Sequence, residues 1–90
     1  MKKAYSVRYH KRALKALAKM DRSTSVLLIN WIESNLVGCL DPRFTGKPLS
    51  GSLKGSWRYR VGDYRIIAEI KDDEVLILLL NVGHRKEIYR

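Results

Sequence analysis

Residues that form disulfides and metal sites are scarce in this chain of 90 residues. The single cysteine, Cys39, excludes an intrachain disulfide, and with only two histidines the chain cannot supply a zinc site of the Cys/His type. Long apolar runs are missing too, because the longest, 75–80, is far shorter than the roughly 20 residues that cross a bilayer. Basic residues stand where a signal peptide needs an apolar segment. The sequence therefore predicts a cytoplasmic protein with no metal, no cofactor and no membrane partner.

Acidic residues are also few. The chain has 9 Asp and Glu against 18 Lys and Arg, which gives a formal net charge of +9. This balance favours a polyanionic partner, either nucleic acid or an acidic protein. The hydrophobic content of 46% is ordinary for a folded protein, and the length fits a single domain over residues 1–90.

Periodic patterns divide the chain into elements. Residues 5–9 alternate between apolar and polar, which predicts a strand. Helical spacing predicts one helix from Lys11 and a second from its cap, Asp21, to about Leu36, and a loop rich in glycine and proline follows over 38–56. Three strands are expected at 57–61, 64–70 and 75–82, and the last is continuously apolar, as a central strand covered on both faces would be. We expect an α+β fold of order β-α-α-β-β-β, with an antiparallel meander sheet and both helices packed on one face.

The second helix is apolar on two sides. A core stripe is expected from Leu28, Ile29, Ile32 and Leu36. Leu27 and Trp31 form a second apolar spot well round the helix. Two interpretations are open: Trp31 covers an edge of the core, or Leu27 and Trp31 form a docking surface for a partner protein.

The hairpin expected around Gly62-Asp63 places several arginines on one face. With these two residues as the turn, Arg60 lies directly opposite Arg65, and Arg58 lies two residues along on the same face. Like charges at directly opposed positions are destabilising. An anion held between the guanidiniums would explain them, because arginine binds phosphate oxygens with two parallel hydrogen bonds. The alternative is a solvated basic face with Glu69 as a partial counter-charge.

The C-terminal residues are expected to join this face. A meander returns the end of strand 75–82 toward the hairpin, so that Arg85, Tyr89 and His84 could reach the arginines. A tyrosine beside clustered arginines can stack on a nucleic-acid base.

Two motifs now support a resemblance. The segment 55–67, G-S-W-R-Y-R-V-G-D-Y-R-I-I, and the segment 82–89, V-G-H-R-K-E-I-Y, resemble the RelE branch of the RelE/ParE toxin superfamily. The resemblance covers nearly the whole chain and implies a single RelE-like toxin domain with a microbial-RNase-like fold. It implies a toxin that cuts mRNA in the ribosomal A site, with ribosome and mRNA as partners. A cognate antitoxin would silence the toxin, and the pair would bind operator DNA only as a complex.

The resemblance also implies catalytic residues. By their positions in the motifs these are Arg58, Arg60, Arg65, Arg85 and Tyr89. Some relatives carry lysines at the first two positions, and a lysine can be tuned into a general base, whereas an arginine cannot. The base is therefore open between Tyr89 and His84, whose ordinary pKa suits the role.

Basic residues outside the hairpin are candidates for contacts with RNA phosphates. They are Lys11, Arg12, Lys15 and Lys19, which follow one another along the first helix, and Lys54 in the loop. Such contacts are sensitive to salt and blind to sequence. The alternative is a solvated helix face.

Two other functions compete with the endonuclease. One is a ParE-like inhibitor of DNA gyrase that acts by binding, without nuclease activity. The other is a small nucleic-acid-binding module that is not an enzyme.

Overall fold

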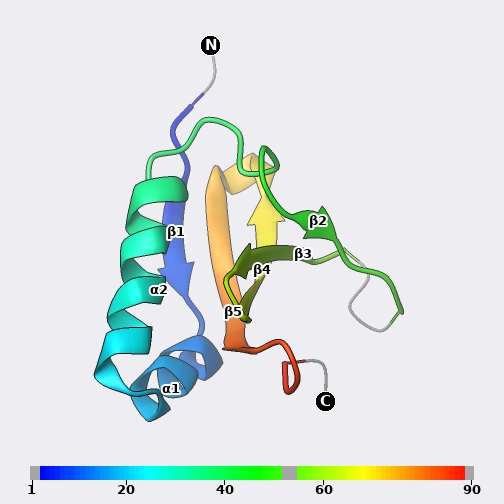
Figure 1. Cartoon of the computed structure of the whole chain (residues 1–90). Coiled ribbons are helices and arrows are strands. Elements are labelled where there is room, and N and C mark those ends of the chain that lie inside the picture. Colours follow the sequence, from blue (N-terminus) through cyan, green and yellow to red (C-terminus); the bar gives the residue numbers. More distant parts are fainter. Residues whose placement is uncertain (1–2, 52–54, 89–90) are drawn as a thin grey trace.

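The computed structural model describes residues 3–51 and 55–88 and has the α+β class that the sequence predicts. Tyr89 and Lys54 lie outside the described residues. The elements, shown in Figure 1, are β1 (Ser6–Tyr9), α1 (Lys11–Lys19), α2 (Arg22–Asn35), β2 (Lys47–Pro48), β3 (Trp57–Val61), β4 (Tyr64–Lys71), a short 3₁₀ turn (Asp72–Glu74) and β5 (Leu76–His84).

Side-chain caps set where the two helices begin. His10 caps α1 by accepting a hydrogen bond from the backbone N–H of Arg12 at 3.0 Å. Asp21 caps α2, as predicted, by accepting from the N–H of Thr24 at 3.3 Å. Hydrogen bonds from the hydroxyls of Ser23 and Thr24, together with this backbone bond, lower the pKa of Asp21. Beyond the end of α2, Gly38 has a φ of +78°, the left-handed conformation that terminates helices.

The sheet has five strands in the order β1-β5-β4-β3-β2. From β2 to β5 all pairs are antiparallel, which confirms the expected meander. β1 departs from it, because it pairs with β5 in parallel, with Ser6 opposite Leu76. A second difference is β2, which lies in the segment expected to be loop and occupies the sheet edge, where a proline such as Pro48 is tolerated.

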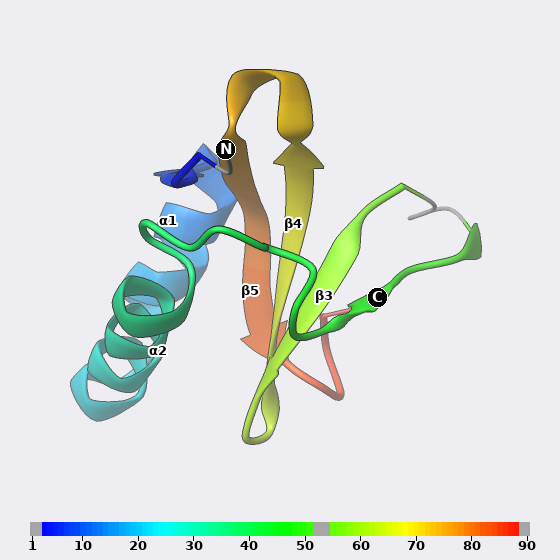
Figure 2. The ribbon, with the colours of Figure 1, turned by 90° about the horizontal axis from the view of Figure 1, so that it is seen from above.

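Both helices cover the same face of the sheet (Figures 1 and 2). The core between the layers is formed by Ala13 and Leu17 of α1, Leu28 and Ile32 of α2, Leu36 after it, and Tyr59, Val61, Ile66, Ala68, Ile77, Leu79 and Val82 of the sheet. Ile29, also expected in the core, is 37% exposed, so the buried stripe of α2 is narrower than predicted. In the part of the chain that is described, no helix is long and apolar enough to span a membrane.

The apolar strand β5 is internal, as expected, with β1 on one side and β4 on the other. A register irregularity at Ile67/Ala68 of β4 lets both Leu79 and Val82 face the core, although they are three residues apart. The sequence predicts that both faces of β5 are covered, but the face away from the helices is covered only in part. Leu76, Leu78 and Leu80 on that face are half-buried.

Candidate functional site

The β3–β4 hairpin has the predicted register. Val61 lies opposite Tyr64, so Gly62 and Asp63 form the turn, and Arg60 lies opposite Arg65. Gly62 has a φ of +59°, which suits a two-residue hairpin turn. The face that carries Arg58, Arg60 and Arg65 is opposite the core face, and we call it the arginine face.

Arg65 is held differently from the expectation. Only 6% of the residue is exposed, and its Nη1 donates to the carbonyl oxygens of Gly62 and Tyr64 at 3.1 and 3.0 Å. The guanidinium is thus bound to its own turn, and carbonyl dipoles partly offset its charge. This arrangement relieves the repulsion between Arg65 and Arg60 without the bound anion that was one of the two explanations offered from the sequence.

Arg58 and Arg60 remain uncompensated. Arg60 is exposed, whereas Arg58 is half-buried and its Nε atom is enclosed without a hydrogen-bond partner among the described residues. Neither side chain forms an ion pair with a carboxylate in the described ranges, and Glu69 forms none with them. Because buried polar atoms normally have partners, the Arg58 Nε is an unsatisfied donor within the described residues.

Arg85 reaches the tip of the hairpin, as expected. Its backbone N–H donates to the carbonyl of Asp63 at 2.8 Å, and its Nε lies 3.9 Å from the Asp63 carboxylate. The following segment folds back beside Gly83, where an added Cβ would lie 3.1 Å from Ile88. Gly83 is opposite Arg65, so Ile88 packs on the arginine face.

His84 does not reach that face, and the expectation that it could is wrong. It lies opposite Tyr64 on the helix side of the sheet, and the two rings meet edge to face at 5.5 Å. The cause is alternation along β5: Val82 points into the core, so His84, two residues on, points the same way. Its Nδ1 accepts a hydrogen bond from the N–H of Lys86 at 3.2 Å.

The other candidate residues are dispersed. All four basic residues expected on α1, Lys11, Arg12, Lys15 and Lys19, are exposed and belong to the helix layer, across the sheet from the arginine face. Leu27 is 57% exposed. Trp31 is half-buried against the core, with its ring 5.7 Å from that of Tyr59, which supports the interpretation that it covers a core edge.

A pocket at the outer edge of β3 brings further residues to Arg58 and Arg60. It has a volume of about 210 Å³ and is lined by Trp31, Thr45, Gly46, Lys47, Arg58 and Arg60, and we call it the edge pocket. Lys47 of β2 lies opposite Arg58, which gives the pocket three cationic side chains. Lys47 could not be predicted as a site residue, because the Gly46-Lys47-Pro48 run lacks the alternation of a strand and the whole of 38–56 was expected to be loop.

Gly46 shapes this pocket. Its φ is +86°, and a Cβ there would lie 2.3 Å from the carbonyl oxygen of Arg58 and 2.5 Å from the indole nitrogen of Trp57. The same indole donates to the carbonyl of Thr45 at 2.8 Å. The loop therefore crosses the edge of β3 at van der Waals contact, which only glycine permits at this position.

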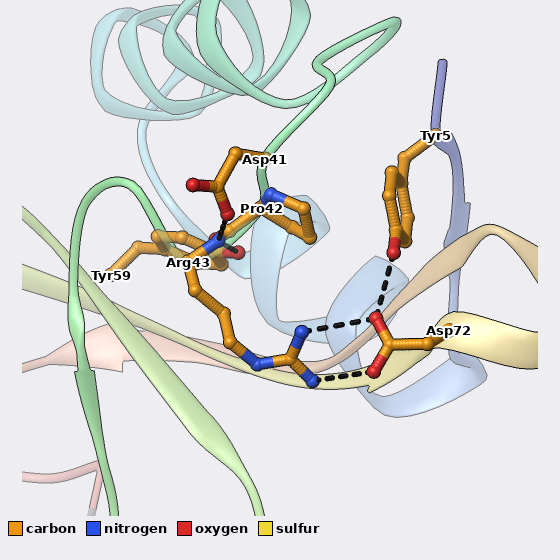
Figure 3. Close-up of polar contacts among 6 residues, drawn as sticks. All are labelled: Tyr5, Asp41, Pro42, Arg43, Tyr59 and Asp72. Carbon is orange, nitrogen blue, oxygen red and sulfur yellow. Dashed lines mark hydrogen bonds and ion pairs between the residues drawn. The ribbon is translucent and has the colours of Figure 1, made fainter. Parts of the chain in front are cut away.

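A polar cluster anchors the preceding loop to the far end of the sheet (Figure 3). Arg43 donates to both carboxylate oxygens of Asp72, at 3.0 and 2.9 Å, and Tyr5 donates to the same carboxylate at 2.7 Å. Deeper in, the buried hydroxyl of Tyr59 donates to the carbonyl of Pro42 at 2.6 Å. The bonds from Arg43 and Tyr5 lower the pKa of Asp72. No local sequence motif predicts this cluster, because its members are far apart in the chain.

Among the described residues, the structure does not favour catalysis by a cysteine nucleophile or by a bound metal ion. Burial and the nearby Asp41 raise the pKa of the Cys39 thiol, which disfavours a nucleophilic thiolate. Within 3–51 and 55–88, His, Cys, Asp and Glu do not gather in groups that could hold a metal ion. The groups of this site that could act on a ligand are therefore the guanidiniums.

Comparison with known proteins is consistent with this geometry. A family model described as "ParE toxin of type II toxin-antitoxin system, parDE" matches residues 7–89. Toxin RelG of Mycobacterium tuberculosis (strain ATCC 25618 / H37Rv) is 31% identical over 86 residues, which are 96% of this chain and 97% of the relative.

Solved structures share the fold. The toxin–antitoxin complex RelBE2 from M. tuberculosis contains a chain that superposes with a TM-score of 0.82 at 28% identity, covering 93% of this chain and 94% of the other. A mutant of E. coli toxin RelE in the free state superposes with a TM-score of 0.74 at 22% identity, over 96% of this chain and 88% of that one. With a family model that spans all but its ends and a relative matched over nearly its full length, the chain belongs to the RelE/ParE family of type II toxin–antitoxin toxins.

Proposed function

We propose that this toxin is a metal-independent endoribonuclease that cuts mRNA in the A site of the ribosome and thereby stops translation. The observation that carries the proposal is the uncompensated pair Arg58 and Arg60, beside the buried Arg65 and the hairpin-docked Arg85. Family membership supports a toxin, and a cluster of guanidiniums supports work on a phosphate. Such a protein acts in the cytoplasm, where its ribosomes are.

The proposed reaction uses the RNA's own 2′-hydroxyl. The 2′-oxygen bonds to the adjacent phosphorus as the bond from phosphorus to the 5′-oxygen breaks; a base takes the 2′ proton, and the 5′-oxygen gains one. Arg58 and Arg60 stabilise the negative charge that develops on the phosphorane, usually the largest contribution to such catalysis. Arg65 supports the hairpin and adds positive potential beneath them, and Arg85 holds the leaving oxygen.

Tyr89 is the remaining candidate for orienting the nucleobase of the target nucleotide and for taking the 2′ proton as the general base. An arginine is a poor general base because its pKa exceeds about 12. His84 is left out of the catalytic group, because its ring stacks on Tyr64 across the sheet from the arginines.

We also propose the partners of a type II toxin. The RelBE2 structure is a toxin–antitoxin complex, and we infer that a cognate antitoxin covers this toxin and binds operator DNA with it. Leu27, 57% exposed on α2, is a candidate antitoxin contact. Lys11, Arg12, Lys15 and Lys19 of α1, together with Lys54, would contact ribosomal RNA phosphates.

The test is primer extension on a defined mRNA in a purified translation system, with and without ribosomes. Arg60→Ala is the sharpest variant, because the exposed side chain supports no described contact and its loss should leave the fold intact. We expect roughly a 10²- to 10³-fold loss of cleavage rate, the range for removing one electrostatic stabiliser. Arg22→Ala is the matched control, since it removes the same guanidinium charge from an exposed position at the start of α2, in the helix layer.

Cuts within A-site codons that require ribosomes would support the proposal, provided that Arg22→Ala retains nearly full activity. Equal losses in the two variants would mean that net charge alone matters. No cuts from folded wild-type protein would refute the endonuclease.

One observation favours a second candidate, the ParE-like inhibitor of DNA gyrase: the matching family model is described as a ParE toxin. A binding inhibitor needs no phosphorane stabilisation, so Arg60→Ala would then change affinity modestly. Induced expression distinguishes the two, because the endonuclease halts translation whereas the gyrase inhibitor causes DNA damage.

A further inference from the structure

The edge pocket pairs an aromatic wall with three cations. It is about 210 Å³ in volume, below the roughly 300 Å³ at which pockets for whole small molecules begin, so it suits one part of a larger ligand. Its position matters, because Arg58 and Arg60 belong both to this pocket and to the arginine face.

Trp31 is a rigid platform in this pocket. Its ring packs at 5.7 Å and 52° against that of Tyr59, which is fully buried and fixed by its hydrogen bond to Pro42. The rest of the half-buried indole lines the pocket. A ring already immobilised by the core loses little conformational entropy when a second flat group stacks on it.

The cations of the pocket are placed for an anion. The Arg58 Nε is enclosed without a partner among the described residues, and Lys47 lies opposite Arg58 across the β2–β3 pair. A buried donor without an acceptor costs free energy, and a turn of the Arg58 side chain that brought this donor to a ligand oxygen would recover it. A flat apolar wall beside such donors matches the two halves of a nucleotide.

We propose that the edge pocket binds one nucleotide of single-stranded RNA next to the cleaved bond, with the base stacked on Trp31 and the phosphate held by Arg58 and Lys47. The identity of the ligand as RNA rests on the proposed function. Because Arg58 and Arg60 line both sites, a nucleotide held here places the next phosphate on the arginine face. Trp31 is thus a binding residue that fixes the register of the strand.

The experiment measures binding apart from cleavage. The probe is a short fluorescent single-stranded RNA whose 2′-hydroxyls are methylated, so that it binds but cannot be cut, and affinity is read by anisotropy. Trp31→Ala should weaken binding by roughly 5- to 150-fold, the range for losing one stacked base. Trp31→Phe should keep most of the affinity, because a smaller aromatic ring still stacks. Val26→Ala is the control on the same helix, since Val26 is 44% exposed and does not line the pocket.

Thermal melts accompany every variant, because Trp31→Ala also removes packing from Tyr59. Rescue of RNA binding by Trp31→Phe, with Val26→Ala binding like the wild type, would establish the base platform. The proposal would be overturned by any of three results. These are RNA binding by Trp31→Ala equal to that of the wild type, binding by folded Trp31→Phe as poor as that of Trp31→Ala, or no binding of the probe by the wild type. Loss of antitoxin binding with RNA binding intact would instead assign Trp31 to the protein partner. RNA binding with the expected pattern but without ribosome-dependent cleavage would refute the endonuclease and leave this site standing.

Discussion

The Arg43–Asp72 contact yields a prediction about stability that can be worked from the structure. The side chains are 44% and 56% exposed, and exposed ion pairs generally contribute about 0.2–1 kcal/mol. Two parallel hydrogen bonds and a third from Tyr5 place this pair near the upper end, at about 1 kcal/mol. For a domain of this size, Arg43→Ala should lower the melting temperature by roughly 4–8 °C.

The same contact predicts a pH dependence. Because Asp72 has a lowered pKa in the folded protein, its carboxylate stabilises the fold above the ordinary pKa of an aspartate, near 4. This contribution is lost as the pH falls through the lowered value. The wild type should therefore lose stability on acidification more steeply than Asp72→Asn, and the difference between their curves isolates Asp72 from Asp21, whose pKa is also lowered.

The assay is a double-mutant cycle in urea, with Arg43→Ala, Asp72→Asn and the double variant at neutral pH and again near pH 3. At neutral pH the two single changes should share one interaction energy, so the double variant is less destabilised than their sum. Strict additivity at neutral pH would refute the reasoning. It would mean that Arg43 and Asp72 are not coupled and that the loop is held by its other contacts, Tyr59 to Pro42 and Trp57 to Thr45.

Three further predictions concern the same loop. Gly46→Ala should destabilise the fold by about 1–3 kcal/mol in a melt, because a side chain is strained at a φ of +86° and collides with the Arg58 carbonyl; an unchanged melting temperature would contradict the contact. Tyr59→Phe should cost about 1–3 kcal/mol, because the Pro42 carbonyl loses its buried donor. Cys39 should react with iodoacetamide more slowly than a free thiol at pH 7, since its raised pKa keeps it protonated, and a rate equal to that of glutathione would argue against its burial.

The hairpin could be predicted from sequence because its information is local. A two-residue turn fixes the register, and alternation then assigns each side chain to a face, so Arg60 opposite Arg65 followed directly. The helix boundaries at Asp21 and Gly38 were predictable for the same reason, since caps act within a few residues.

Features that depend on distant segments could not be predicted. Alternation identified β1 as a strand but carried no information about its neighbour, and the parallel pairing with β5 joins residues about 70 positions apart. His84 was misplaced because its face depends on the register of β5, which an irregularity shifts. The hydrogen bonds of Arg65 to its own turn were missed because pattern analysis assigns a face and gives no side-chain rotamer.

The candidate site was therefore predicted in part. The arginine face and the return of Arg85 to it were foreseen, whereas Lys47 and the edge pocket depend on how the loop crosses β3. That crossing is set by Gly46 and by two anchors of the loop, Thr45 to Trp57 of β3 and Arg43 to Asp72 of the 3₁₀ turn, so it depends on three separate segments.

The parallel pairing of β1 with β5 has a consequence for biosynthesis. Ser6–Tyr9 emerges from the ribosome early, but its partner strand Leu76–His84 emerges only after some 75 further residues, roughly 4–15 s later at ordinary elongation rates of about 5–20 residues per second. Until then β4 also lacks one neighbour, and the core lacks Ile77, Leu79 and Val82. Until Leu76–His84 has emerged, the nascent chain cannot complete its sheet, so formation of the core has to wait for β5.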